Sequence, residues 1–541
     1  MRNLMTTLIP ALVLASCTSF DAPISSSPGS SLVEERSISD LQGDLTAGRT
    51  TSEALVEAYL ARIAAMDHAG PTLQAVISVN PTAAADARAL DAERRAGRVR
   101  GPLHGIPILL KDNIETRELP TTAGSLALSQ NMTGRDAPMA ARLREAGAIL
   151  LGKTNLSEWA NYRSTRSISG WSATGGLVRN PYALDRNACG SSSGSGAAAA
   201  ASYAAAAIGT ETSGSIVCPS SMNGLVGLKP TVGLVSRTGV VPISHTMDTP
   251  GPMVRSVMDA ALVLTVIAGT DPADPATAEA DRRRQDYTVG LKPRALVGRR
   301  LGVLRIGIGG HAETDKLFEQ ALADLRAAGA ELVDIKQPPD QQAIGAHTGI
   351  IMQTEFKAGI ATYLATAAPA VKVRTLADLI AFNKESADRE MPLFGQEIFE
   401  ASDARNGLDD PKYIEALAAG KRLTGPEGID RMLAADRLDA IIAITGAPAW
   451  FSDPAGASRG AAVNVATILP ALAGYPHLTV PMGLANGLPV GLSFIGPAWS
   501  EADLLAMGYG YEQATKRRAP PTYVPSLSAI PHIARALEPA Q

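Results

Sequence analysis

Short apolar runs alternate along this chain with segments of helical periodicity. The spacing of apolar positions predicts helices over residues 51–63, 82–95 and 138–147. Apolar runs of the length of a buried strand occupy 106–110, 148–151, 204–209, 302–306, 440–444 and 477–481. The segment 271–436 is richer in helical pattern and in charge. Together these patterns predict an α/β fold with a buried sheet.

Two serine-rich turns lie on either side of a small-residue segment. The first spans 189–195 (CGSSSGS), and the second spans 212–215 (TSGS). Gly214 can adopt backbone conformations that other residues avoid, so the second turn can direct successive N–H groups at one point. A tetrahedral oxyanion requires such a set of donors. The two turns therefore predict acyl-transfer chemistry.

A lysine stands at the end of the apolar run 106–110. A serine hydroxyl is a weak nucleophile until a neighbouring group takes its proton, and a lysine can do so only when burial keeps its amine neutral. Lys111 is a candidate for that base. Ser191 can relay a proton between base and nucleophile, because a hydroxyl both donates and accepts.

At these residues the sequence resembles the amidase signature family. The resemblance covers residues 37–518 and runs through 105–113 (GIPILLKDN), 152–160 (GKTNLSEWA), 179–182 (RNPY), both serine turns, 227–231 (GLKPT), 248–252 (DTPGP) and 487–493 (GLPVGLS). It implies a single large α/β domain over 37–541, with a central mixed sheet covered by helices on both faces. Residues of about 271–436 would then form a helix-rich substrate-pocket region.

The family's catalytic set is a Ser-Ser-Lys triad. Carried over by position, the resemblance implies that Ser215 is the nucleophile, Ser191 the relay after a cis peptide bond, and Lys111 the base. It places Thr212, Ser213 and Gly214 around the oxyanion. It implies a serine amidohydrolase that uses no cofactor, and the sequence itself indicates no metal.

Some positions depart from the commonest family pattern and resemble its peptide amidase branch. Cys189 and Ser193 replace glycines of the first turn, and Val217 stands where an arginine is common. Together with 169–172 (SGWS) and 355–357 (EFK), these variants favour peptide C-terminal amides as substrates. Ser169, Trp171 and Val217 are the candidate substrate-binding residues. Other aliphatic or aryl amides and linear oligoamides remain open.

Two competing motifs predict other chemistry. Residues 147–154 (GAILLGKT) satisfy the Walker A pattern, but its lysine falls beside a predicted strand with a helix before it, which is the wrong context for a phosphate loop. Residues 190–194 fit the Gly-x-Ser-x-Gly elbow of α/β-hydrolases, with Ser192 as nucleophile and His477 as its best partner. That hypothesis leaves the turn at Ser215 without a role. His104 is interpreted as a turn residue.

The three cysteines restrict the redox possibilities. They allow at most one disulfide once Cys17 is set aside, and no Cys/His cluster has the spacing of a zinc site. Cys189 and Cys218 are interpreted as small buried packing residues rather than nucleophiles, since neither has an evident histidine partner. Whether they interact is left open.

The amino terminus predicts export. A short positive region precedes an apolar stretch too short for a permanent membrane span, and residues 14–17 (LASC) resemble a bacterial lipobox. The pattern predicts a signal peptide over 1–16, lipid on Cys17 and a flexible tether over 17–36. We expect a periplasm-facing lipoprotein of the outer membrane, with plain signal cleavage as the alternative.

Composition narrows the partners. A net charge of -4 with no basic stripe argues against nucleic acid, and 45% apolar residues suffice for a large core. The expected partner is a small-molecule or peptide amide, with the membrane reached only through the lipid. A tRNA-dependent amidotransferase subunit shares these motifs, but export argues against it. A non-enzymatic envelope lipoprotein that binds amides is the alternative from another class.

Overall fold

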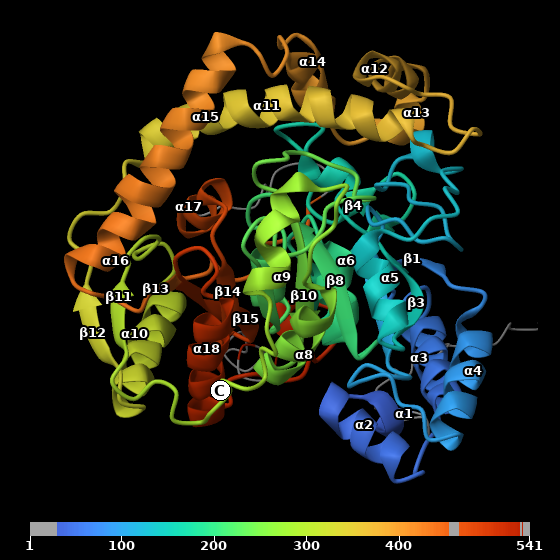
Figure 1. The fold of residues 1–541 in the computed structure, drawn as a ribbon, viewed down its shortest axis with the longest axis horizontal. Coiled ribbons are helices and arrows are strands. Elements are labelled where there is room, and N and C mark those ends of the chain that lie inside the picture. Colours follow the sequence, from blue (N-terminus) through green and yellow to red (C-terminus); the bar gives the residue numbers. More distant parts are fainter. Residues whose placement is uncertain (1–29, 454–464, 531–532, 534–541) are drawn as a thin grey trace, which may run out of the picture.

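A computed structural model describes residues 30–453 and 465–530, together with residue 533. Its centre is an 11-stranded mixed sheet (Figure 1). In spatial order the strands are β1 (Val76–Val79), β3 (Ile149–Thr154), β2 (Pro107–Lys111), β8 (Ala206–Glu211), β10 (Thr249–Val254), β9 (Val226–Lys229), β14 (His477–Ala485), β15 (Leu488–Ile495), β13 (Ala440–Ile444), β11 (Arg300–Val303) and β12 (Glu331–Asp334). The predicted single α/β domain with a mixed sheet is confirmed.

All six predicted strands are present, with ends shifted by a few residues. One strand that the sequence did not predict is β10, whose Pro250 and Pro252 argue against a central strand. On one side β10 pairs with β8 along five residues, but on the other side it pairs with β9 only at Met253 and Val254. Pro250 and Pro252 therefore lie outside the short pairing with β9, where the lack of an N–H group costs no hydrogen bond.

Helices pack against the sheet and against one another. α6 contacts β8 and α7 contacts β9, whereas α8 lies on β10 and α18 on β14. The helices of the core are α1 (Ser30–Val33), α2 (Ile38–Thr46), α3 (Ser52–Met66), α4 (Ala83–Arg95), α5 (Pro138–Glu145), α6 (Ser193–Ala200), α7 (Val217–Met222), α8 (Val257–Ile267), α10 (Ala312–Ala327), α17 (Val465–Ala473) and α18 (Glu501–Thr515). Two short hairpins, β4 (Trp171–Ser172) with β5 (Gly176–Leu177) and β6 (Arg179–Asn180) with β7 (Ala183–Asn187), precede α6.

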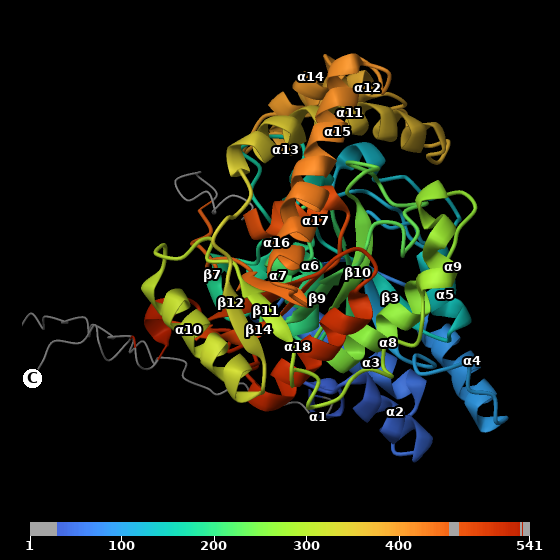
Figure 2. The ribbon, with the colours of Figure 1, turned by 60° about the vertical axis from the view of Figure 1, so that its left-hand side comes forward.

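Most of the helix-rich segment predicted over 271–436 forms an arch beside the sheet (Figures 1 and 2). Its longest member, the 25-residue helix α11, crosses above the core. The segment contains α9 (Ala280–Arg283), α11 (Gln341–Ala365), α12 (Leu376–Glu385), α13 (Ala387–Glu390), α14 (Glu397–Asp403), α15 (Pro411–Thr424) and α16 (Arg431–Ala435). It also supplies β11, β12 and α10, so it is continuous with the core rather than a separate domain.

The predicted signal peptide and Cys17 lie outside the described residues. The tether predicted over 17–36 ends earlier than expected, because residues 32–36 pack on the domain. Val33 is buried, the Glu35 N–H donates to Ser202 Oγ at 3.0 Å, and Arg518 forms an ion pair with Glu35. Within the described residues, no helix combines the length and the apolar character needed to cross a bilayer.

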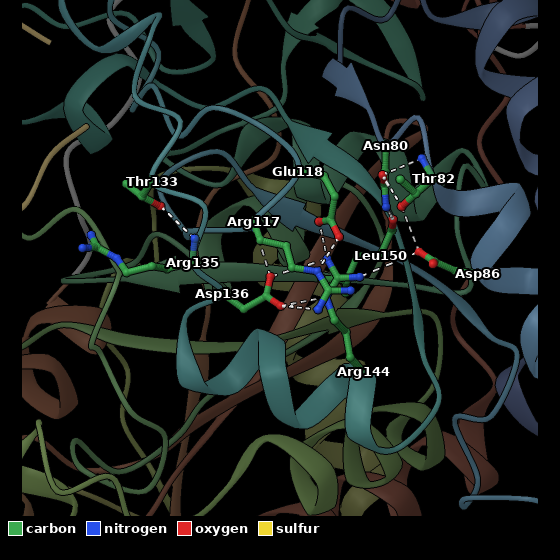
Figure 3. Close-up of polar contacts among 10 residues, drawn as sticks. All are labelled: Asn80, Thr82, Asp86, Arg117, Glu118, Thr133, Arg135, Asp136, Arg144 and Leu150. Atoms are coloured by element: carbon green, nitrogen blue, oxygen red, sulfur yellow. Dashed lines mark hydrogen bonds and ion pairs between the residues drawn. The ribbon is translucent and has the colours of Figure 1, made fainter. Parts of the chain in front are cut away.

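Charged side chains link neighbouring elements near β3 (Figure 3). Arg144 of α5 forms ion pairs with Glu118, with Asp136 at 2.9 Å and with Asp86 of α4 at 3.8 Å. Arg117 pairs with Glu118 at 2.8 Å. This network contains charges of both signs and connects α5, α4 and the segment after β2, so each of these charged groups has a partner within the fold.

Candidate active site

The candidate base stands where two parallel strands end. β2 and β8 are parallel neighbours, so Lys111 and Thr210 meet at the same edge of the sheet. The fully buried Lys111 Nζ lies 2.8 Å from Ser191 Oγ and 2.9 Å from Thr210 Oγ1, and it also contacts the Thr210 carbonyl at 3.3 Å. The structure thus brings the predicted base and the predicted relay into direct contact.

The electrostatic surroundings favour the neutral form of this amine. Burial lowers the pKa of Lys111 to about 7, although the negative charges of Asp248 and Glu211 oppose that shift. A lysine with an ordinary pKa carries its proton at neutral pH and cannot accept another. The lowered pKa leaves a substantial share of the Lys111 amine unprotonated near pH 7 and free to accept a proton.

The two serine turns lie side by side. The Ser192 N–H donates to the Ser215 carbonyl at 3.2 Å, and the bond between Gly190 and Ser191 is the expected cis peptide. Ser191 is fully buried and Ser215 is 8% exposed. The predicted nucleophile therefore retains a small exposed surface, whereas the predicted relay retains none.

The turn before Ser215 presents unused donors. Gly214 adopts a φ of 79°, which permits the tight reversal into α7. The N–H groups of Ser213, Gly214 and Ser215 have no acceptor among the residues that the structure describes. Buried or enclosed N–H groups normally find a partner, so this turn is equipped to bind a negatively charged oxygen.

A disulfide joins the two serine turns. Cys189 and Cys218 are bonded, with Cα atoms 6.0 Å apart and a sequence separation of 29. Their interpretation as packing residues was incomplete, because the sequence could not place them within bonding distance. The covalent link connects the residue before Gly190 to helix α7, directly after the second turn.

The elbow hypothesis for Ser192 is not supported by the geometry. The buried Ser192 Oγ donates to the Thr210 carbonyl at 3.0 Å and accepts from the Thr210 N–H at 3.2 Å. His477 lies in β14 and its Nε2 is bonded to Ser493 Oγ at 2.7 Å. Burial lowers the pKa of His477 to about 3, so this ring belongs to the core rather than to a triad.

The Walker A hypothesis also fails, because Gly152, Lys153 and Thr154 all belong to strand β3. The Lys153 ammonium pairs with buried Asp112 at 3.0 Å instead of facing an anion site. His104, interpreted as a turn residue, is buried and its Nε2 lies 3.0 Å from the Leu90 carbonyl. It has a structural role away from Lys111.

The three candidate substrate-binding residues have different surroundings. The Ser169 hydroxyl accepts from Asn161 Nδ2 at 2.9 Å, and the Trp171 ring packs edge-on against Phe394 at 5.2 Å. Val217 is fully buried at the start of α7, where its N–H donates to Glu211. Their predicted contact with substrate stays a prediction.

Several polar residues of the site were not predicted. Thr210 holds the base, Asn113 donates to Thr210 Oγ1 at 3.0 Å, and Asp248 accepts from Thr212 Oγ1 at 2.6 Å. All three stand beside or within the motifs noted above, but spacing alone assigns them no role. No group of potential metal ligands occurs among the described residues.

A buried amine in contact with a serine hydroxyl, beside a turn with unused N–H donors, is the arrangement of a hydrolase that uses a lysine in place of histidine. The amidase family profile matches residues 54–505. The chain is 38% identical over 503 residues to a probable amidase of Arabidopsis thaliana, covering 91% of this chain and 92% of the relative. It therefore belongs to the amidase family and is a hydrolase of amide C–N bonds.

Two further similarities bear on its specificity. The crystal structure of a peptide amidase from Stenotrophomonas maltophilia superposes with a TM-score of 0.86 at 53% identity, over 91% of this chain and 99% of that one. A glutamyl-tRNA(Gln) amidotransferase component of Synechococcus is 35% identical over 502 residues, covering 90% of this chain and 94% of the relative.

Proposed function

We propose that this amidase removes the C-terminal amide of peptides by way of an acyl-enzyme on Ser215. The observation that carries the proposal is the 2.8 Å contact between the buried Lys111 amine and the Ser191 hydroxyl. The 53% identity to a peptide amidase supports the substrate class.

In the proposed reaction the neutral Lys111 amine accepts the Ser191 proton while Ser191 takes the proton of Ser215. The Ser215 oxygen forms a bond to the amide carbon, and the carbonyl electron pair moves onto its oxygen. The N–H groups of the 212–215 turn stabilise this oxyanion. The C–N bond then breaks, and the proton returns through Ser191 to the leaving nitrogen, which departs as ammonia.

Water completes the cycle by the same route. Lys111 and Ser191 take a proton from water as its oxygen attacks the ester carbon, and the ester bond to Ser215 breaks. The serine oxygen recovers its proton, and the peptide leaves with a free carboxyl group. The overall balance is peptide amide plus water to peptide acid plus ammonia, and no cofactor is required.

The surroundings of the site favour uncharged substrates. Asn113, which donates to Thr210 Oγ1, also lines a narrow recess with Ala123, Trp159, Ala160, Val241, Pro242 and Ile243, and none of these side chains is charged. Val217 replaces the arginine that could pair with a substrate carboxylate. An anionic half-amide would therefore bury its charge without a partner.

Turnover and labelling test the chemistry. We expect Ser215→Ala and Lys111→Ala each to lower kcat by about three or more orders of magnitude, as members of one catalytic unit do. The matched control is Ser192→Ala, which removes the adjacent hydroxyl and should lose far less. A fluorophosphonate should label Ser215. Wild-type turnover by Ser215→Ala would refute the mechanism.

A substrate panel tests the specificity. Ammonia release from an uncharged peptide amide should exceed that from a short anionic half-amide by at least about a hundredfold in kcat/KM. Equal kcat/KM values for the two substrates would contradict the preference for uncharged substrates that we infer from Val217. Faster hydrolysis of a simple aliphatic or aryl amide would assign the enzyme to the broader amidase class.

We also propose that the enzyme is exported and anchored through lipid on Cys17. The lipobox pattern at 14–17 supports this location, and the disulfide between Cys189 and Cys218 is typical of oxidising compartments. Charged tRNA is made in the cytoplasm, so this location argues against an amidotransferase role despite the similarity to the Synechococcus protein.

A further inference from the structure

Asp248 lies directly beside the turn that carries the nucleophile. It precedes β10, whose first residue, Thr249, pairs with Glu211 at the end of β8. One carboxylate oxygen accepts from Thr212 Oγ1 at 2.6 Å. The other accepts from the N–H groups of Ile243 at 2.8 Å and Ser244 at 2.9 Å. The side chain therefore joins the first residue of the turn to a separate loop.

That loop is itself fixed by the helical arch. The fully buried Glu355 of α11 accepts hydrogen bonds from the Ser244 hydroxyl, the Thr246 N–H at 3.1 Å and the Thr246 hydroxyl at 2.5 Å. The Tyr413 hydroxyl of α15 also donates to Glu355, at 2.8 Å. A continuous set of hydrogen bonds thus connects α11 to the 243–248 loop, and from there through Asp248 to Thr212.

Charged groups from several elements surround this carboxylate. Lys111 of β2 and Arg237 carry the opposite sign, and the Lys111 amine contacts Thr210, the residue of β8 that pairs with Pro250 of β10. His245, in the same loop as Asp248, lies 3.4 Å from Glu355. Glu211 of β8 and Glu355 of α11 carry the same sign. Burial raises the pKa of Asp248, but three donors point at its two oxygens and oppose that shift. These donors fit the ionised form.

We propose that Asp248 is a positioning residue of the amidase reaction: it fixes the 212–215 turn through Thr212, and its charge holds the proton on Lys111 during the catalytic cycle. The inference rests on the proposed function, since it assigns Asp248 a task only if Lys111 is the base. Asp248 contacts neither the amide nor Ser215 in this account and acts through Thr212 and Lys111.

Two substitutions separate the two tasks. Asp248→Asn removes the charge but can keep the hydrogen bonds, because its oxygen can face the two N–H groups while its nitrogen donates to Thr212 Oγ1. We expect the acid limb of the kcat/KM–pH profile to move down by about half to one pH unit, since a missing negative charge favours the neutral amine. Thr212→Val keeps the charge and removes the bond. It should lower kcat about tenfold or more with little change in KM and no shift of the limb.

Glu355→Gln is the matched control. It neutralises a buried carboxylate that binds the same loop but makes no contact with the turn. It is expected to lower the melting temperature without moving the acid limb. Thr212→Ser restores the hydroxyl and should recover most of the kcat lost in Thr212→Val.

The outcomes separate this inference from the proposed function. If Ser215 is labelled by a fluorophosphonate in every variant but Asp248→Asn leaves the acid limb in place, the charge assignment is wrong. An unchanged kcat in Thr212→Val overturns the positioning role, and this result remains decisive if Asp248→Asn fails to fold. A missing label on wild-type Ser215 would instead contradict the proposed function.

Discussion

The disulfide between Cys189 and Cys218 gives the sharpest quantitative prediction. We expect Cys189→Ala/Cys218→Ala to unfold more easily and to turn over more slowly than the wild type. The bond closes a loop with a sequence separation of 29 residues. Without it, the unfolded chain regains the freedom that the loop closure removes, and both serine turns lose a covalent connection.

The magnitude follows from the loop length. The chain-entropy relation for a loop of about 29 residues gives about 3.6 kcal/mol at 25 °C. An unfolding entropy of roughly 2.1 cal/mol/K per residue over about 500 residues is about 1 kcal/mol/K. Dividing the two predicts a fall in melting temperature of about 3 to 4 °C. If the serine turns also shift, a loss of kcat of about tenfold would correspond to an activation free energy about 1.4 kcal/mol higher.

Differential scanning fluorimetry and ammonia release measure the two effects. Wild-type protein treated with dithiothreitol should behave like the double variant, and dithiothreitol should have no effect on the double variant. Cys189→Ala alone should match the double variant, because either substitution breaks the same bond. A melting temperature and kcat both unchanged by reduction would refute the reasoning.

Three further predictions follow from the buried lysine and the amino terminus. The pH dependence of kcat/KM should rise through an apparent pKa near the value of about 7 of Lys111, and Lys111→Arg should be nearly inactive because guanidinium keeps its proton. Since that pKa lies below the unfolded value of 10.5, the unfolded chain binds more protons, so stability should rise from pH 7 toward 10.5. At pH 6, Lys111→Met should have a free energy of unfolding up to about 4 to 5 kcal/mol above that of the wild type in urea denaturation. An unchanged free energy of unfolding would contradict the lowered pKa of Lys111. The Cys17→Ala variant should no longer be found in the membrane fraction, and the kcat of the variant should be unchanged. Mass spectrometry that finds no lipid on mature Cys17 would exclude anchoring.

The sequence by itself determined the fold class, the family and the candidate triad. Apolar runs such as 440–444 predict buried strands because their length and composition fit a covered sheet, and β13 coincides with that run. The candidate residues lie in short local motifs, and a glycine-bounded turn has much the same geometry wherever it occurs. Residue type and spacing, together with the resemblance to the amidase signature family, were therefore enough to select Lys111, Ser191 and Ser215.

Contacts between distant segments were decided only by the tertiary structure. Cys189 and Cys218 are bonded because α7 folds back on the first turn, and no spacing rule predicts a pairing across 29 residues. The pKa of Lys111 depends on how completely β2 and its neighbours exclude water. Asp248 reaches Thr212 across 36 positions because β10 pairs with β8. Burial and long-range pairing depend on the whole packed chain, so a local pattern cannot specify them.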